Sequence, residues 1–441
     1  MAGAAAGARR SATAKRGSGS ASAPASASKA ARPQARAATP PLEHRILITA
    51  TLCLLAFGAV MVYSASSPRD LLSGSGSGTA SFLRYLVFGA IGLIAMHVLS
   101  RRGLAIFNQR LVTLMLLGSF GLLVLVLVPG FGVQVNGARR WFAAGPIQFQ
   151  PSEVMKLAIV LYVARFLADH PKRMRSFKQA VVPILMVAGP ACLLIVVEPD
   201  LGTTLVIVFA ITALLVAGGI PMRYLGLLAL IGGALVLVMV VAQPYQRARL
   251  TSFLNPWSSK STAGFQAVQG QIALGSGGLF GVGLGRSVQK VFYLPEAQTD
   301  FILAVIGEEL GVIGIFGVVC LYGMIAYAGL RTARRAAGRY AKLLATGLTS
   351  LILCQGILNI FVVLGLAPLT GVPLPFISYA PTNLCIMLAC VGLLLNIASP
   401  DTPRLKVVGD SRREPAEDRD RRRRDRRSRR SGAGGRGRTP R

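Results

Sequence analysis

Charged residues, and acids above all, are scarce in this sequence. Only 15% of its 441 residues are charged, and 17 are Asp or Glu against 48 Lys or Arg. Soluble domains carry about 25% charged residues, so this composition argues against a soluble globular protein. Each acid that falls in an apolar stretch needs an explanation, because a carboxylate inside a membrane is costly.

Cysteine and histidine are also few, and they do not group. The three histidines are scattered, and the six cysteines lie in apolar stretches without the spacing of metal ligands. We interpret the cysteines as packing residues rather than disulfide partners or metal ligands, and predict no bound metal at them. The glycine run GVGLG (281–285) follows no predicted strand, so it is not interpreted as a phosphate loop. The cysteines are Cys53, Cys192, Cys320, Cys354, Cys385 and Cys390.

Long apolar runs are what the sequence has in abundance, since 53% of its residues are hydrophobic. A run of roughly 20 apolar residues is enough to cross a bilayer as a helix. Backbone groups must be satisfied inside lipid, which favours helices over strands. The sequence therefore predicts an all-α polytopic membrane protein with ten spans. They are expected near 46–64, 82–99, 111–128, 152–167, 181–197, 201–217, 224–242, 301–328, 343–366 and 375–398.

The distribution of basic residues predicts the orientation of these helices. Basic residues crowd the first 45 residues, the segments 101–102, 171–178 and 331–339, and the tail 419–430. By the positive-inside rule these parts are cytoplasmic, which places both termini there. The segments 129–151, 198–200, 243–300 and 367–374 are then outside.

Three regions follow from this pattern. Residues 1–45 and 399–441 are predicted to be disordered basic cytoplasmic tails, and 46–398 the membrane domain with a large outer loop at 243–300. The net charge of +31 invites a nucleic-acid hypothesis, but basic tails beside membrane spans are typical of contact with anionic lipid or protein partners. We expect membrane lipids and no nucleic acid as partners.

Polar residues that need explaining collect on the predicted outer side. In QPSEVMKL (150–157), Pro151 and Ser152 indicate a helix start, and Glu153 and Lys156 share one face of its first turn. A structural ion pair is the alternative there, with Glu153 favoured by the helix dipole. That alternative is weaker for Lys156, because a cation one turn inside a membrane helix is expensive.

Two further outer clusters carry charges. In EPDLGT, which begins at Glu198, Asp200 either caps the following helix or serves a site, and the sequence leaves both open. The 243–300 loop shows no obvious secondary structure, and a loop of this length is usually functional. The loop carries an excess of cations although the positive-inside rule predicts few on the outer side. They are Arg247, Arg249, Lys260, Arg286 and Lys290.

These features together indicate one kind of chemistry. Outer arginines and lysines suit a phosphate or diphosphate, and the apolar surroundings suit a lipid tail. An ionised aspartate can act as the base for a hydroxyl. A diphosphate leaving group needs charge neutralisation rather than protonation, so one base with cations suffices.

Five stretches resemble the SEDS family of shape, elongation, division and sporulation proteins, in the family's order and across 46–398. They are NGARRW, QPSEVMKL, EPDLGT, YLPEAQTDFILAVIGEELG and GLAPLTGVPLPFISY. The first and fourth look more like the family's division branch than its elongation branch. The resemblance implies a ten-helix peptidoglycan glycosyltransferase that polymerises lipid II into a nascent glycan chain outside the bacterial cytoplasmic membrane. It also implies a class B penicillin-binding protein, a transpeptidase, and other division proteins as partners.

The resemblance also implies roles for residues. The family's essential aspartate falls on Asp300, which would act as general base. The predicted substrate-binding residues of the cavity are Arg140, Glu153, Lys156, Arg286, Lys290 and Ser378. A cofactor is not required by this scheme, although a divalent cation, Mg²⁺ or Mn²⁺, held with help from Glu153 and Asp300 is left open.

One departure from the family stands after FISY. The family commonly has small residues of the Gly-Gly-Ser-Ser kind there, whereas this chain has Ala380, Pro381, Thr382 and Asn383. Pro381 removes a backbone donor, so it either ends a re-entrant turn before the last helix or reshapes a wall of the cavity.

Rival interpretations remain open from the sequence. Asp300 could be only a helix cap, or a partner of the helix dipole at the start of the span near 301–328. Glu308 and Glu309 lie about 12 to 13 Å further along the helix, too deep to share a hydroxyl with Asp300. We therefore interpret one of them as a buried hydrogen-bonded or ion-paired group that fixes the helix bundle, and neither as catalytic. A lipid-linked precursor flippase and a non-catalytic division or sporulation scaffold are the alternative functions. The clustering of cations at one face favours the enzyme over a flippase.

Overall fold

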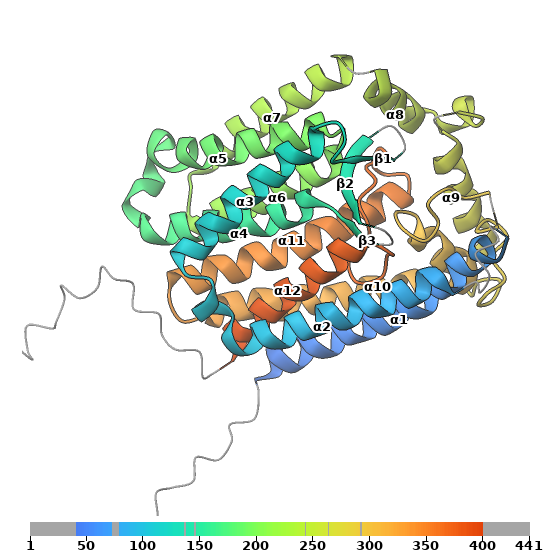
Figure 1. The fold of residues 1–441 in the computed structure, drawn as a ribbon, viewed down its shortest axis with the longest axis horizontal. Coiled ribbons are helices and arrows are strands. Elements are labelled where there is room, and N and C mark those ends of the chain that lie inside the picture. The colour runs from blue at the N-terminus through green and yellow to red at the C-terminus, as the bar shows by residue number, and fades with distance from the viewer. Residues whose placement is uncertain are drawn as a thin grey trace, which may run out of the picture. The chain divides into compact units, whose positions relative to one another are not determined.

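The computed structural model describes residues 41–72, 79–135, 138–144, 147–242, 244–262, 264–291 and 293–399, which all belong to one compact unit (Figure 1). The predictions of disorder for the two basic tails fall almost wholly outside these residues. Within them the chain is helical apart from one small antiparallel sheet.

The described residues form a helix at each of the ten predicted positions. By length and apolar composition, eight of the described helices qualify as membrane spans. The other two predicted spans correspond to α4, which carries Glu153 and Lys156 in its first two turns, and α7. The ten helices are α1 (Leu42–Leu72), α2 (Ala80–Ile106), α3 (Gln109–Leu127), α4 (Pro151–Asp169), α5 (Phe177–Val197), α6 (Leu201–Gly218), α7 (Met222–Ala242), α10 (Ile302–Arg335), α11 (Arg339–Val363) and α12 (Pro381–Ala398).

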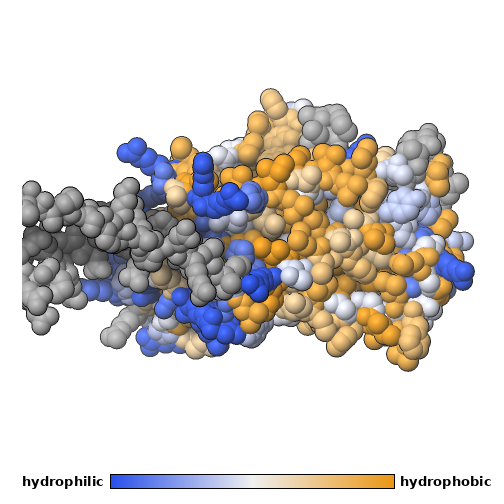
Figure 2. Space-filling view, turned by 90° about the horizontal axis from the view of Figure 1, so that it is seen from below, coloured by the Kyte–Doolittle hydropathy of each residue, from blue (hydrophilic) through white to orange (hydrophobic). Residues whose placement is uncertain are grey.

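The core lies around α4, α11 and α12. α12 packs along α2 and against α11, and α11 packs against α4, α6 and α10. Outside this core the helices expose apolar side chains such as Val87, Ile94 and Leu114, which suits a surrounding of lipid rather than water. Figure 2 shows this broad hydrophobic face, with hydrophilic side chains gathered at one end of the bundle.

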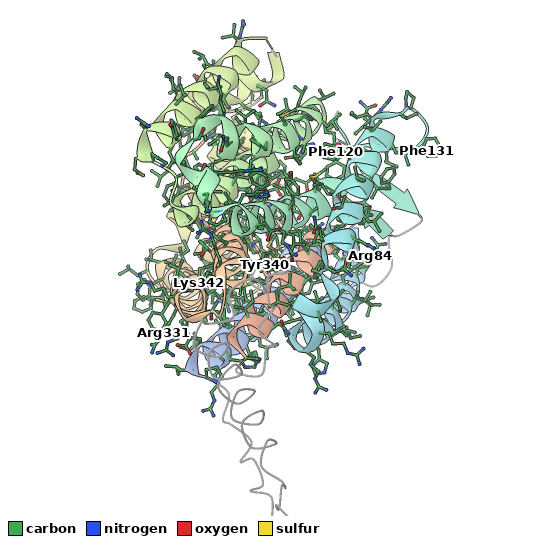
Figure 3. The ribbon with its side chains drawn as sticks, turned by 90° about the vertical axis from the view of Figure 1, so that its left-hand side faces the viewer. Arg84, Phe120, Phe131, Arg331, Tyr340 and Lys342 are labelled. Carbon is green, nitrogen blue, oxygen red and sulfur yellow. The ribbon has the colours of Figure 1, made fainter. Side chains whose placement is uncertain are left out.

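An ion-pair cluster joins α1 and α10 at the predicted cytoplasmic end. Glu43 is buried, and its Oε1 lies 2.7 Å from Arg331 Nε and 2.6 Å from Arg335 Nη1. Figure 3 views the helices from this end, where α10 finishes and α11 begins. The pairing helps fix the start of the first helix against the end of α10.

The prediction that the 243–300 loop lacks secondary structure is wrong. The loop contains α8 (Pro244–Leu254), the 3₁₀ turn η2 (Pro256–Ser259) and α9 (Phe265–Gly277). These helices are short and only weakly amphipathic, so their formation depends on packing, such as that of α9 against α10, more than on a periodic pattern. A second 3₁₀ turn, η1 (Pro171–Arg175), follows α4.

The outer segment 129–151 forms strands that the sequence did not predict. β1 (Val133–Val135), β2 (Ala138–Ala144) and β3 (Ile147–Phe149) make an antiparallel sheet in the order β1-β2-β3. Val133 pairs with Trp141, and Phe142 with Phe149. Arg140 and Trp141 belong to β2, which Figure 1 shows between α4 and the segment that carries α8 and α9.

Gly311 interrupts α10 with a kink at φ 67°. The loop segment 278–283 lies against this kink, where Val282 N donates to Glu308 O and Val312 N donates to Gly278 O. A Cβ on Gly311 would lie 2.4 Å from Leu279 O, so only glycine permits this approach. The outer loop is thereby fastened to the helix that follows Asp300.

The last helix begins at Pro381 rather than near 375. Residues 366–380 form a loop that leads into it, and Pro381 occupies its first turn, where a missing backbone donor costs nothing. Of the two effects considered for Pro381, the structure shows the first, since the proline follows the turn and starts the helix. Ala380, Pro381 and the next two residues also form part of a pocket wall, so the second effect stays a prediction.

Candidate active site

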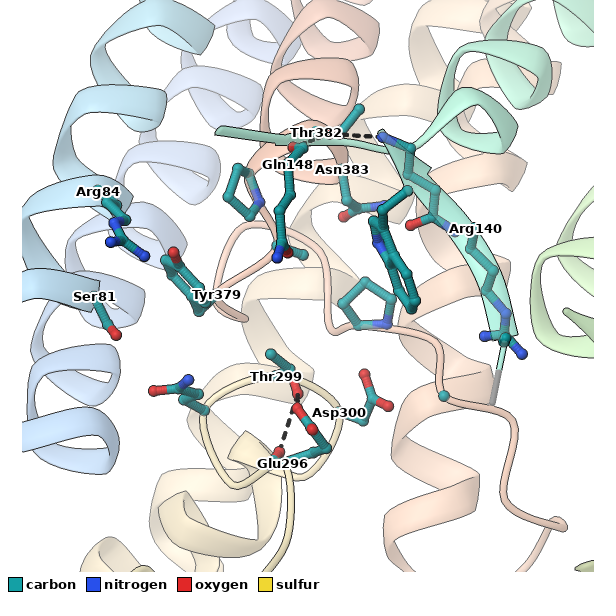
Figure 4. A pocket seen from close by; sticks show the side chains of 18 of the residues that line it. Ser81, Arg84, Arg140, Gln148, Glu296, Thr299, Asp300, Tyr379, Thr382 and Asn383 are labelled. Atoms are coloured by element: carbon teal, nitrogen blue, oxygen red, sulfur yellow. Dashed lines mark hydrogen bonds between the residues drawn. The ribbon is translucent and has the colours of Figure 1, made fainter. Parts of the chain in front are cut away.

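A pocket of about 440 Å³ opens among the predicted outer ends of the helices (Figure 4). Several separate parts of the chain supply its walls: the start of α2, strands β2 and β3, helices α8 and α9, the loop before α10, and the segment before and at the start of α12. Its polar lining residues include Ser81, Arg84, Arg140, Trp141, Gln148, Gln150, Arg249, Gln266, Glu296, Gln298, Thr299, Asp300, Tyr379, Thr382 and Asn383.

Asp300 lies in the wall of this pocket with its carboxylate free of hydrogen bonds from the described residues. The side chain is not a helix cap, because α10 begins at Ile302 with Phe301 at its N-cap and no side-chain cap bond. The capping part of that alternative is therefore wrong, whereas an interaction of Asp300 with the helix dipole stays a prediction.

The backbone around Asp300 is held from three sides. Asn359 Nδ2 on α11 donates to Asp300 O at 2.7 Å, and Ser378 Oγ donates to Thr299 O at 2.6 Å. Tyr379 N donates to Gln298 O at 2.9 Å. These bonds fix the main chain while leaving the carboxylate available, as a catalytic base requires.

The surroundings of Asp300 make it a stronger base than an ordinary carboxylate. Burial raises the pKa of Asp300 to about 7, with a further rise from Glu296. Arg249 and Arg140 act in the opposite direction, and Asp200 adds a smaller rise. A base whose pKa lies near the working pH is well matched to proton abstraction.

Arg140 reaches the pocket from β2. Its Nε donates to Glu198 O at 2.8 Å and its Nη2 to Pro199 O, so it caps the end of α5 while its guanidinium lines the pocket. The carboxylate of Glu198 does not neutralise it, because burial raises the pKa of Glu198 to about 9, with Asp200 adding to the rise and Arg140 opposing it. Arg140 therefore keeps its positive charge beside Asp300.

Arg249 on α8 is a second arginine near Asp300. Its Nη1 donates to Leu369 O at 2.9 Å, which positions the guanidinium at the pocket wall. The sequence placed Arg249 among the outer cations but did not select it for the site. With Arg140, it makes this side of the pocket suited to a diphosphate group.

Glu153 and Lys156 form a buried pair rather than a part of the pocket lining. Lys156 Nζ lies 2.9 Å from Glu153 Oε2 and donates to Gln355 Oε1 at 2.8 Å. Asn383 Nδ2 donates to Glu153 Oε2 at 2.7 Å. The side chain of Lys156 is 1% exposed and that of Glu153 is 2% exposed. The geometry therefore fits a structural ion pair more closely than direct contact with substrate.

This pair connects to the loop that forms the floor of the pocket. Gln355 Nε2, held by Lys156 at its other end, donates to Pro373 O at 2.9 Å. Prolines in the loop cannot donate, and unpaired carbonyls at membrane depth are costly. Four successive side-chain donors satisfy them: Asn359 to Val372 O, Gln355 to Pro373 O, Tyr322 to Pro375 O and Tyr85 to Phe376 O.

The other predicted binding residues do not line the pocket. Ser378 is buried, and its hydroxyl accepts from Leu374 N at 2.8 Å while donating to Thr299 O. Lys290 is buried and lies 2.7 Å from Glu309 Oε1. Arg286 is exposed elsewhere on the outer loop.

The two deeper acids behave as bundle-fixing groups. Glu309 pairs with Lys290 and accepts from Ser64 Oγ at 2.7 Å. Glu308 Oε2 accepts from Ser287 Oγ at 2.5 Å, and its Oε1 from Val288 N at 3.0 Å. The prediction that neither reaches Asp300's substrate agrees with this placement.

Asp200 serves as a helix cap. Its carboxylate accepts from Thr203 N at 3.1 Å at the start of α6, and from Gln150 Nε2 at 3.1 Å. Of the two possibilities left open by the sequence, capping is therefore the one that the structure shows.

The residues that depart from the family pattern join α12 to the strands. Gln150 N donates to Thr382 Oγ1, which donates to Gln148 O, both at 3.2 Å. The sequence identified the stretch from Ala380 to Asn383 as unusual, but it did not predict these hydrogen bonds of Thr382.

The described residues do not form a ligand set for a metal ion. They contain no group of three or more His, Cys, Asp or Glu side chains placed to hold one. Glu153, the expected partner of Asp300 in such a site, is committed to Lys156 and Asn383.

Comparison with known proteins places the chain among relatives. The family model for cell cycle proteins of the FtsW, RodA and SpoVE group matches residues 44–402. Stage V sporulation protein E of Bacillus subtilis is 42% identical over 354 residues, covering 80% of this chain and 96% of that protein. The probable peptidoglycan glycosyltransferase FtsW of Pseudomonas fluorescens is 42% identical over 357 residues, covering 80% and 86%.

Two solved structures are also similar to this chain. A chain from a study of how a peptidoglycan synthase complex coordinates polymerization and crosslinking superimposes with a TM-score of 0.64 at 28% identity, covering 82% of this chain and 98% of that one. The rod shape determining protein RodA of Thermus thermophilus gives a TM-score of 0.57 at 27% identity, covering 82% and 97%.

Proposed function

The chain belongs to the FtsW, RodA and SpoVE family, also called the SEDS family, and is a multi-pass peptidoglycan glycosyltransferase of the bacterial cytoplasmic membrane. We propose that it polymerises lipid II with Asp300 as the general base. The observation that carries the proposal is the carboxylate of Asp300, unbonded within the described residues, in an outer pocket beside two arginines.

The reaction follows from the charges in the pocket. Asp300 takes the proton of the acceptor sugar's hydroxyl, and the hydroxyl oxygen forms a bond to the anomeric carbon of the lipid-linked donor chain. The bond between that carbon and the diphosphate breaks, and the diphosphate leaves with the electron pair. Arg140 and Arg249 neutralise the charge that develops on it.

Cell division is the process that we propose for this activity, because several relatives at about 40% identity are named FtsW. A penicillin-binding protein is the expected partner, since the superimposed synthase complex couples polymerization with crosslinking. Its identity as a class B transpeptidase, and contact with other division proteins, belong to the proposal.

Mg²⁺ or Mn²⁺ is not assigned a step. Glu296 and Asp300 are the two described carboxylates in the pocket lining, and both come from one short loop. Mg²⁺ is usually bound through one or two carboxylates together with waters and substrate phosphates, so these two residues would hold such an ion jointly with the diphosphate.

A flippase is less well supported. The charged groups beneath the pocket, Glu153 and Lys156, are paired with each other and buried, and the floor loop is closed by four side-chain bonds. The pocket therefore has its charges at one face, as a polymerase requires.

The test is lipid II polymerisation by the purified chain with its partner transpeptidase, comparing wild type with Asp300→Asn. Asp169→Asn is a matched control. Asp169 is the last residue of α4, it does not line the pocket, and its Oδ2 lies 3.2 Å from Arg165 Nε. We expect no glycan from Asp300→Asn and normal glycan from the control, with equal melting temperatures. Glycan formation by Asp300→Asn would place the base elsewhere.

A further inference from the structure

Arg84 is a cation of the pocket that the proposed chemistry has not used. It lies in the second turn of α2, and its side chain lines the pocket together with Ser81. The side chain is exposed, and it has no hydrogen bond or ion pair to any part of the chain that the structure describes. An arginine at the outer end of a membrane helix works against the positive-inside distribution, so topology does not account for it.

Arg84 lies across the pocket from the arginines beside Asp300. Figure 4 draws Arg84 and Tyr379 on one side and Arg140 on the other, with the loop of Asp300 between and below them. Arg249 and Arg140 both lower the pKa of Asp300, which places them on the side of the base. The pocket thus has two separate cationic poles, one near the base and one remote from it.

The surroundings of Arg84 suit a lipid-linked anion. α2 begins at Ala80, so its second turn lies close to the positive end of the helix dipole. Along the same helix, toward the membrane, Val87, Ile91 and Ile94 expose apolar side chains. A diphosphate at Arg84 could leave its hydrocarbon tail along this apolar surface.

The proposed reaction assigns the two poles to different substrates. The diphosphate that leaves is attached to the carbon under attack, so it must lie near Asp300, at Arg140 and Arg249. The acceptor presents its hydroxyl to Asp300 from the far end of its disaccharide, and its own diphosphate is attached at the opposite end. The acceptor diphosphate therefore falls at a remote cation.

We propose that Arg84 binds the diphosphate of the incoming acceptor, a polyprenyl-diphosphate-linked disaccharide. This assignment rests on the proposed glycosyltransferase function. Arg84 is then a binding residue that determines acceptor affinity, and it takes no part in proton transfer. Its planar guanidinium is suited to a bidentate bond with phosphate oxygens.

The experiment titrates lipid II with wild type, Arg84→Ala, Arg84→Lys and Arg247→Ala, each with the partner transpeptidase. Arg247 is the control, because it is another exposed outer arginine, which donates to Val241 O at 2.6 Å and does not line the pocket. For Arg84→Ala we expect KM for lipid II to rise roughly 10- to 100-fold, or about 1.4 to 2.7 kcal/mol, with kcat changed less than about twofold. The KM of Arg84→Lys should lie between those of wild type and Arg84→Ala, because lysine keeps the positive charge but loses the bidentate geometry of the guanidinium.

A second measurement removes turnover. In the Asp300→Asn background, binding of fluorescent lipid II to detergent-solubilised protein is expected to show two classes of site, of which Arg84→Ala removes one. Unchanged KM and unchanged binding in Arg84→Ala would overturn the inference.

The two proposals fail differently. If wild type makes no glycan, the proposed function fails. If wild type polymerises, Asp300→Asn does not, and Arg84→Ala matches Arg247→Ala, only the assignment of Arg84 fails. A fall in kcat without a change in KM would also overturn it, because acceptor binding would then be unaffected.

Discussion

The buried pair of Glu153 and Lys156 offers a sharp test of whether these residues bind substrate or hold the pocket floor. In Lys156→Met, Glu153 keeps one donor, Asn383, and Gln355 Oε1 loses the ammonium that it accepts from. An unpaired carboxylate then stays buried at 2% exposure. Breaking a buried pair in this way costs about 3–5 kcal/mol of stability.

Removing both charges should cost much less. In the double variant Glu153→Gln with Lys156→Met, no charge is left buried, and the new amide can still accept from Asn383. Replacement of a buried ion pair by neutral groups of similar size is often close to neutral in stability. We therefore expect the single variant to melt well below wild type and the double variant to melt near it.

The assay is thermal melting in detergent together with lipid II polymerisation by the same samples. Arg165→Met is the control, because Arg165 pairs with Asp169 on the same helix at 33% and 31% exposure, and such surface pairs contribute about 0.2–1 kcal/mol. If the pair acts through Gln355 and Pro373, activity returns with stability in the double variant. A double variant that melts like wild type and makes no glycan would refute this reasoning and return Lys156 to substrate binding.

Three further predictions follow from the pocket. Because burial raises the pKa of Asp300 to about 7 in the substrate-free protein, the ionised base is lost as pH falls, and kcat/KM for lipid II should drop about tenfold per pH unit well below pH 7 and level off above it. A flat kcat/KM profile across this range would contradict a base with a pKa near 7. In Gly371→Ala, the residue has φ 69° and its new Cβ would lie 3.2 Å from Asp300 Oδ2, so we expect turnover to fall roughly tenfold through backbone strain and crowding of the carboxylate. Gly118→Ala, whose Cβ meets nothing within 4 Å, is the control, and equal turnover in both would contradict the contact. Tyr322→Phe leaves Pro375 O buried without its donor, which should cost about 1–3 kcal/mol, and an unchanged melting temperature would show that the loop finds another donor.

The membrane helices were predictable, whereas the outer elements were not. A spanning segment must be apolar along its length and satisfy its own backbone, so both properties are visible locally. The strands at 133–149 and helices α8 and α9 lack such a signal, because they form against neighbours that are distant in the chain. The kink at Gly311 likewise depends on residues 278–283 lying against it.

The candidate site was predicted in part. Asp300 and Arg140 both line the pocket, while Lys290 is committed to Glu309. The sequence shows that a cation lies on an outer loop, but it does not show the partner of that cation. Either a buried carboxylate or a bound phosphate can pair with it. Arg84 went unnoticed because one arginine at a helix end is typical of an interfacial side chain.

The sequence by itself determined that this chain is a ten-helix membrane protein with its unexplained charges toward one face, since apolar length and charge asymmetry are properties of composition along the chain. Only the tertiary structure decided which charges are available to a ligand. Lys156 is paired with Glu153 and Lys290 with Glu309, and all four side chains are buried. Asp300, Arg140, Arg249 and Arg84 line one pocket from separate elements. The physical reason is that availability depends on distance and burial, which residues far apart in the chain acquire only by packing.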